Sequence, residues 1–324
     1  MRNDYAYAVA RIRVRELELL DRAAMNRLLE SHGPEEVFRQ LTDRGWGDGS
    51  TSQNPEEMFA RETAKTWELM EELLPDPSVL DILKLKTDYH NLKAAVKLSY
   101  AGTKIPAGRF FCPGGTCEPE LMLRCARERD YGDLPEKLAA AGREAGTTLL
   151  RTGDGQLCDM LLDRAWMEDL CEQSRKAGDE ALRLYGALTV AAADIRTAVR
   201  CGRTGKSLEF AKRALVPADG LNIDELAAAA LEGGEQTASY LEATEFAGAA
   251  AALRKSDAAF ERWYNSLLME RLKAQKFNSF TVGPLAAYVL ARENEIRYAR
   301  MILSAKQNQL SEETIRERLG ELYV

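Results

Sequence analysis

The chain has 324 residues, with 44 lysines and arginines against 51 aspartates and glutamates, and its formal net charge is −7. Its hydrophobic content of 45% is typical of a folded protein rather than a disordered one. The acidic balance argues against a nucleic-acid-binding surface or a polybasic membrane surface. Because the length exceeds the roughly 250–300 residues at which a single core stops growing, we expect two or three domains.

Targeting signals and reactive side chains are scarce. No stretch approaches the roughly 18 apolar residues of a membrane helix, and the charged first residues lack the apolar core of a signal peptide. We therefore expect the protein to stay in the compartment where it is made. Six cysteines are too few for a disulfide scaffold, which predicts free thiols in a reducing cytosol. Two histidines, His32 and His90, leave little material for a histidine-based active site, although carboxylate chemistry remains open.

Apolar residues recur at spacings of three or four along most of the chain, which predicts helices. The stripes cover residues 5–20, 82–100, 184–199 and 285–303. Pro77 and Ser78 predict the start of the second helix, and Gly283-Pro284 predicts the start of the last. Glycines and prolines are concentrated between Gly102 and Pro119, which predicts a loop and a domain boundary. Since no alternation of period two is sustained, the predicted fold class is all-α.

A short pattern of polar acceptor, branched aliphatic and cation occurs in three of these helices. The copies are Asn91-Leu92-Lys93, Asp194-Ile195-Arg196 and Glu295-Ile296-Arg297. Residues 21–28 also match residues 163–170 at five of eight positions. These repeats predict three similar domains, residues 1–110, 111–207 and 208–324. Each copy can bond a neighbouring helix on both flanks of its buried aliphatic residue; the alternative is three solvated helix faces.

Two patterns that imitate functional sites are better explained otherwise. Gly205-Lys206-Ser207 resembles the end of a phosphate-binding loop, but Arg200 occupies the place of the first glycine and a helix precedes it. We predict that Gly202–Gly205 ends that helix instead. The spacing of Cys112, Cys117 and Cys125 does not match a structural zinc site. No carboxylate pair stands out as a catalytic dyad, so we predict no catalytic residue, no metal and no cofactor.

Several segments together, in the same order along the chain, carry a resemblance to a known family. They are Tyr5–Arg11, Asp21-Arg22, Asp88–Lys97, Pro113–Leu121, the Asp194-Ile195-Arg196 helix with Gly205-Lys206-Ser207, and Pro284–Arg297. In this combination the chain resembles the C subunit of V-type and archaeal-type ATPases or ATP synthases, whose eukaryotic counterpart is the d subunit of the V-ATPase. Cys112, Cys117 and the glycines of residues 45–49 depart from the pattern that we expect of this family.

The resemblance implies an all-α fold of three similar helical bundles around a pseudo-threefold axis, in the shape of a funnel. It implies a non-catalytic rotor component that couples the central axle, made of the D and F subunits, to the membrane proteolipid ring. Such a component serves ATP-driven ion transport or ATP synthesis from the cytoplasmic face of the membrane. The family offers no short active site to transfer, so the candidate structural or axle- and ring-interface residues come from the three tripeptides and Asp88. They are Asp88, Asn91, Lys93, Asp194, Arg196, Glu295 and Arg297.

Two other functions remain open from the sequence. One is a free-standing helical adaptor outside any ATPase. The other is a helical enzyme that acts through carboxylates and Lys206.

Overall fold

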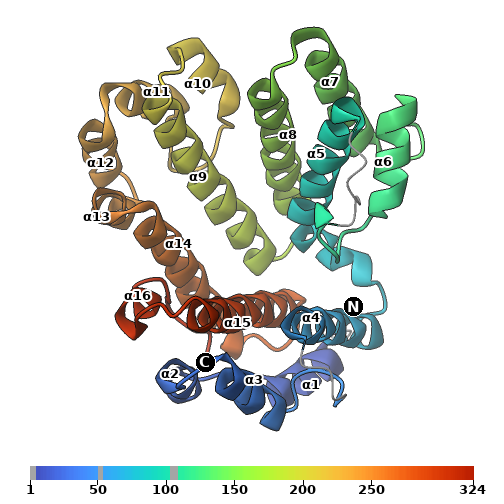
Figure 1. The fold of residues 1–324 in the computed structure, drawn as a ribbon, viewed down its shortest axis with the longest axis vertical. Helices are drawn as coiled ribbons and strands as arrows, with labels where there is room; N and C mark the ends of the chain where they lie inside the picture. Colours follow the sequence, from blue (N-terminus) through green and yellow to red (C-terminus); the bar gives the residue numbers. More distant parts are fainter. Residues whose placement is uncertain (1–4, 50–53, 103–108) are drawn as a thin grey trace. The chain divides into compact units, whose positions relative to one another are not determined.

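A computed structural model describes residues 5–49, 54–102 and 109–324, and these residues form helices and no strand (Figure 1). The predicted all-α fold class is therefore confirmed. Several helices begin with a side chain that accepts a hydrogen bond from the first turn, for example Asp21, Asn54, Asp154 and Ser207. The helices that precede residue 102 are α1 (Ala6–Glu16), α2 (Arg22–Glu30), α3 (Pro34–Asp43), α4 (Pro55–Leu73), the 3₁₀ helix η1 (Pro77–Leu83) and α5 (Leu85–Ala101).

The remaining helices follow residue 118. They are α6 (Pro119–Glu128), α7 (Glu136–Thr152), α8 (Gly155–Lys176), α9 (Glu180–Arg203), α10 (Leu208–Ala214), α11 (Ile223–Glu232), α12 (Gly234–Glu242), α13 (Ala247–Lys255), α14 (Asp257–Leu272), the 3₁₀ helix η3 (Lys273–Phe277), α15 (Gly283–Gln307) and α16 (Glu312–Arg316).

The four predicted apolar stripes correspond to α1, α5, α9 and α15, and α15 begins at Gly283 as predicted. One boundary was wrong, because Pro77 opens η1 and the α-helix starts only at Leu85. A proline followed by serine suits the first turn of either helix type, and short 3₁₀ segments are common at helix starts.

The predicted loop after α5 is confirmed where the structure describes it. Gly102 ends α5 in the left-handed conformation, with φ of 60°, and α6 begins at Pro119. Residues 103–108 lie outside the described residues.

The chain divides into two compact units. Unit 1 comprises residues 1–77, 179–185 and 246–324, and unit 2 comprises residues 78–178 and 186–245. The two units are defined by how densely their residues contact one another, and not by any similarity between segments of the chain. The three domains predicted from the repeats, residues 1–110, 111–207 and 208–324, therefore stay a prediction.

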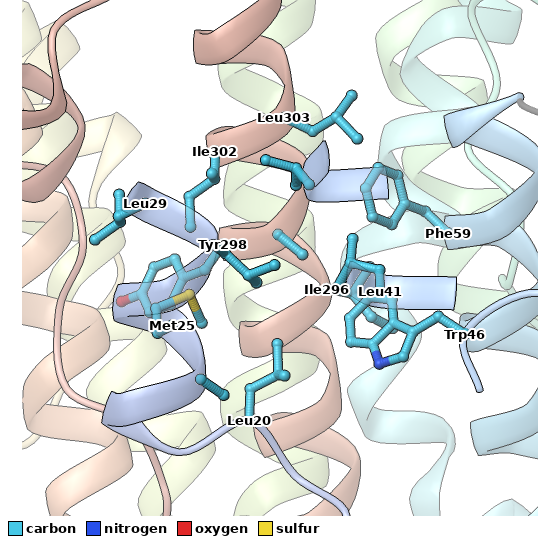
Figure 2. Close-up of a cluster of buried hydrophobic side chains, with 14 of the residues drawn as sticks. Leu20, Met25, Leu29, Leu41, Trp46, Phe59, Ile296, Tyr298, Ile302 and Leu303 are labelled. Atoms are coloured by element: carbon cyan, nitrogen blue, oxygen red, sulfur yellow. The ribbon is translucent and has the colours of Figure 1, made fainter. Parts of the chain in front are cut away.

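The core of unit 1 forms around α15 (Figure 2). Tyr298 and Ile302 of this helix are almost completely buried. The rings of Trp46 and Phe59 meet edge to face, with centroids 6.3 Å apart. The other labelled members of the cluster come from the segment before α2 and from α2, α3 and α15, and are Leu20, Met25, Leu29, Leu41, Ile296 and Leu303. Burying such aliphatic and aromatic side chains contributes roughly 1.5–3 kcal/mol each.

Unit 2 packs α5 against α6, α7 and α8. Leu92 of α5 is fully buried. One of its methyl carbons lies 3.2 Å from where a Cβ on Gly142 of α7 would be. The glycine thus lets α7 approach α5 closely.

Candidate functional site

The candidate residues of α5 hold the loop that connects α5 to α6. Asp88 is fully buried, and its carboxylate accepts hydrogen bonds from the backbone amides of Thr116 (2.8 Å) and Cys117 (3.2 Å) and from the Thr116 hydroxyl (2.7 Å). Burial raises the pKa of Asp88, although these hydrogen bonds oppose the rise. A Cβ on Gly115 would lie 2.4 Å from the Asp88 carboxylate, so glycine is required for this close approach.

Asn91 holds the same loop at a second point. Its side-chain oxygen accepts the backbone N–H of Cys112 at 2.8 Å, and its side-chain amide donates to the Cys112 carbonyl at 2.9 Å. Asn91 is fully buried. An amide side chain matches both groups of one residue's backbone, because it carries a donor and an acceptor side by side.

Asp194 of α9 occupies the corresponding place in the second tripeptide. Its Oδ1 accepts the backbone N–H of Val216 at 3.1 Å, while its Oδ2 is buried without a hydrogen-bond partner among the described residues. Burial raises the pKa of Asp194 to about 8, against the lowering effect of the bond from Val216. The carboxyl group is therefore mostly protonated at neutral pH.

Glu295 of α15 belongs to a buried ionic cluster in unit 1. Its Oε2 accepts the backbone N–H of Leu20 at 2.8 Å, and its other oxygen pairs with Arg292. Arg292 also pairs with Glu62 of α4, and its guanidinium lies 5.1 Å from the centroid of the Trp46 ring. Removing one member of such a buried cluster would leave an uncompensated charge.

The cations of the three tripeptides are more accessible than the acceptors. Lys93 is partly buried and pairs with Asp163 of α8. Arg297 is exposed, bonds Asn294, and lies 5.5 Å from the centroid of the Tyr298 ring. Arg196 is exposed on α9.

The first residues of the three tripeptides thus share one geometry. Asn91, Asp194 and Glu295 are at most 2% exposed, and each accepts a backbone N–H from a segment that leads into a helix. Their role at an axle or ring interface stays a prediction.

Residues 21–28 and 163–170, which match in sequence, do not occupy equivalent positions in the structure. Asp21 caps the start of α2, whereas Asp163 lies inside α8.

Arg292 and Glu62 are buried charged residues that sequence reasoning missed. The local sequence signal for each was a charged side chain among the apolar residues that its helix buries, α4 for Glu62 and α15 for Arg292. Their pairing joins positions 230 residues apart, which no local pattern encodes.

The segment at Gly205-Lys206-Ser207 is a helix end, as predicted. α9 ends at Arg203, Gly205 is left-handed with φ of 63°, and Ser207 caps α10. Lys206 donates to the Gln156 side chain at 2.6 Å. The backbone therefore has the form of a C-terminal helix cap and not of a loop that cradles a phosphate.

The six cysteines are free thiols, as predicted. Cys125, Cys158 and Cys201 are buried, and burial raises the pKa of each. Over the described parts of the chain, no three histidine, cysteine or acidic side chains come together in a way that could hold a metal ion.

Unit 1 also exposes large apolar side chains at the end of α1 and at and after the end of η3. Arg13 of α1 donates to the carbonyls of Gln275 (2.7 Å) and Asn278 (2.8 Å), which flank Phe277. Phe277 is 91% exposed, and Leu17, one turn beyond Arg13, is 85% exposed. Phe280 adds a second exposed aromatic ring to the same segment. We refer to Leu17, Phe277 and Phe280 as the apolar tip.

The structure thus defines an all-helical protein whose buried polar side chains bond backbone groups and each other. Comparison with known proteins identifies the class more closely, because the family model for the ATP synthase (C/AC39) subunit matches residues 8–318. The chain therefore belongs to the ATP synthase (C/AC39) subunit family, and the resemblance noted in the sequence is confirmed.

Relatives match over nearly their whole length. The C subunit of the A-type ATP synthase of Desulfurococcus sp. (strain SY) is 26% identical over 345 aligned residues, covering 98% of this chain and 91% of that protein. The C subunit of the V-type ATP synthase of Thermus thermophilus is 26% identical over 312 residues, covering 93% and 94%. The C subunit of the V-type sodium ATPase of Enterococcus hirae is 20% identical over 324 residues, covering 96% and 97%. Across residues 5–49, 54–102 and 109–324, no helix has both the length and the apolar character that a bilayer crossing requires.

Proposed function

We propose that this chain is a non-catalytic central-stalk component of a V/A-type rotary ATPase, bound to the cytoplasmic face of the membrane. It couples the axle, made of the D and F subunits, to the proteolipid ring, for ATP-driven ion transport or ATP synthesis. The observation that carries the proposal is the family match over residues 8–318, together with relatives named as the C subunit of A-type and V-type enzymes.

The buried acceptors support a mechanical role. A part that transmits torque must not yield at its loops, and each acceptor ties a connecting segment to a long helix at a buried position. A hydrogen bond of this kind contributes about 0.5–1.5 kcal/mol, and more when the acceptor is charged. We infer that Asn91, Asp194 and Glu295 stiffen the chain between its partners.

The apolar tip is the contact that we assign to the proteolipid ring. Exposed aromatic side chains next to an arginine are typical of protein interfaces, where they bury large areas at low entropic cost. Arg13 bonds the backbone on both sides of Phe277, the last residue of η3, so the aromatic side chain is presented on an already ordered segment.

Co-purification tests the proposal. The tagged chain is expressed together with the D and F subunits and the proteolipid ring of the same organism, and each partner is scored in the pull-down. We expect both to be recovered, and Phe277→Asp to lose the ring but keep the axle. Leu310→Asp is the matched control, because Leu310 is also exposed but lies beyond α15. A chain that binds neither intact partner refutes the proposal, and equal loss with both variants refutes the assignment of the apolar tip.

Of the two alternatives, the Lys206 enzyme receives no support from the helix-cap geometry of its loop. The free-standing adaptor predicts normal folding with no recovery of either partner in the same pull-down.

A further inference from the structure

A hollow in unit 2 has the composition of an anion site. It lies between α5, the end of α6 and α7, and its volume is about 100 Å³. Three arginines line it, namely Arg127, Arg129 and Arg143. The described residues that line it include no carboxylate.

These three arginines have no ion pair with any described residue. Arg124, which lies on α6 like Arg127, differs from them because it pairs with Asp133 at 2.7 Å. All three are exposed, so water screens their mutual repulsion and an anion can reach their guanidinium groups from solution. The planar guanidinium fork matches the oxygens of a phosphate better than any other side chain does.

Tyr131, which also lines the hollow, provides an independent indication. It is only 4% exposed, and its ring lies against Gly142 and Gly146 of α7. A Cβ on Gly146, itself a lining residue, would lie 2.9 Å from the Tyr131 hydroxyl. This hydroxyl has no hydrogen-bond partner within the described part of the chain. Because Tyr131 lines the hollow, its hydroxyl can donate a hydrogen bond to a ligand oxygen bound there.

The electrostatics around the phenol agree with this geometry. Burial raises the pKa of Tyr131, whereas the positive charges of Arg129 and Arg143 act to lower it. Both guanidinium groups therefore act on the Tyr131 hydroxyl. The phenol remains a neutral donor at neutral pH, which suits an acceptor oxygen.

We propose that this hollow binds a phosphate group, held by Arg127, Arg129 and Arg143 and by a hydrogen bond from the Tyr131 hydroxyl. A volume of about 100 Å³ accommodates one tetrahedral oxyanion, since a water molecule occupies roughly 30 Å³. Tyr100 and Leu150 line the same hollow and are about half exposed, so they offer an apolar surface to whatever carries the phosphate. The phosphate belongs either to a free ion or to a lipid headgroup.

Binding to the purified full-length chain tests the proposal and does not depend on the rotary function. Inorganic phosphate is titrated by calorimetry, and vesicles of phosphatidylcholine containing phosphatidic acid are tested by co-sedimentation. Binding of inorganic phosphate identifies a free-ion site, and binding of the vesicles alone identifies a headgroup site. We expect Arg143→Gln to weaken binding about tenfold or more, because it removes a charge-assisted hydrogen bond.

Two further variants separate the site from general surface charge. Tyr131→Phe keeps the ring that packs on α7 and removes only the hydroxyl, so it should weaken binding about threefold. Arg151→Gln is the control, because Arg151 lies on the same helix, is exposed and does not line the hollow. The proposal is overturned if neither probe binds, or if Arg151→Gln weakens binding as much as Arg143→Gln does.

Discussion

Asp194→Asn should stabilise the protein at neutral pH. The wild-type carboxyl accepts one bond from Val216 and leaves its second oxygen buried without a partner in the described chain. Asn91 shows what an amide does at the equivalent place, where it bonds both the N–H and the carbonyl of Cys112. Asparagine at position 194 is nearly isosteric, neutral at every pH and able to donate a second bond.

The magnitude follows from the shift in pKa. The pKa of Asp194 rises from its ordinary value of 3.8 to about 8 in the fold. For a carboxyl whose pKa is raised, stability is fully present below the ordinary value and is lost as the pH rises toward the folded value. One pKa unit corresponds to about 1.4 kcal/mol, so the loss near pH 7 amounts to up to about 4 kcal/mol. Asparagine removes this loss.

Urea unfolding followed by far-UV circular dichroism measures the effect between about pH 5 and about pH 9. We expect the gain in unfolding free energy from Asp194→Asn to grow with pH up to about 8 and then to level off. Asp43→Asn is the control, since Asp43 is exposed at the end of α3 and should leave the pH profile of the wild type unchanged. The reasoning is refuted if Asp194→Asn destabilises the protein near pH 7, or if its effect does not change with pH.

Two more substitutions test the packing. Arg292→Met leaves the buried Glu295 without its cation and leaves the buried Glu62 with Lys65 alone, so it should destabilise by about 3–5 kcal/mol in a thermal melt. Arg61→Met, which breaks an exposed pair, should cost less than about 1 kcal/mol. Equal effects would contradict the buried cluster. Gly202→Ala should lower the melting temperature, because its Cβ would lie 2.0 Å from the Ala230 carbonyl oxygen and force overpacking worth about 1–3 kcal/mol. Gly234→Ala has free space around it and should leave the melting temperature unchanged or higher, so a similar loss in both would show that the contact at position 202 is not decisive.

The sequence by itself determined the helices and their ends. The stripes of α5, α9 and α15 could be predicted because a helix repeats within four residues, and that period is written locally. The cap at Gly205 could be predicted for the same reason, since one glycine supplies the left-handed turn. The start at Pro77 could not, because proline and serine suit a 3₁₀ helix as well as an α-helix.

Only the tertiary structure decided what the polar residues of those helices do. The three tripeptides were visible in the sequence, but the amides that their acceptors bond lie 21, 22 and 275 residues away. The hollow lined by Arg143 and Tyr131 had no sequence signal, because its residues belong to three separate segments. Which backbone group a buried side chain bonds, and which charged side chains meet, depends on which helices pack together. Packing is a property of the whole chain rather than of any short segment along it.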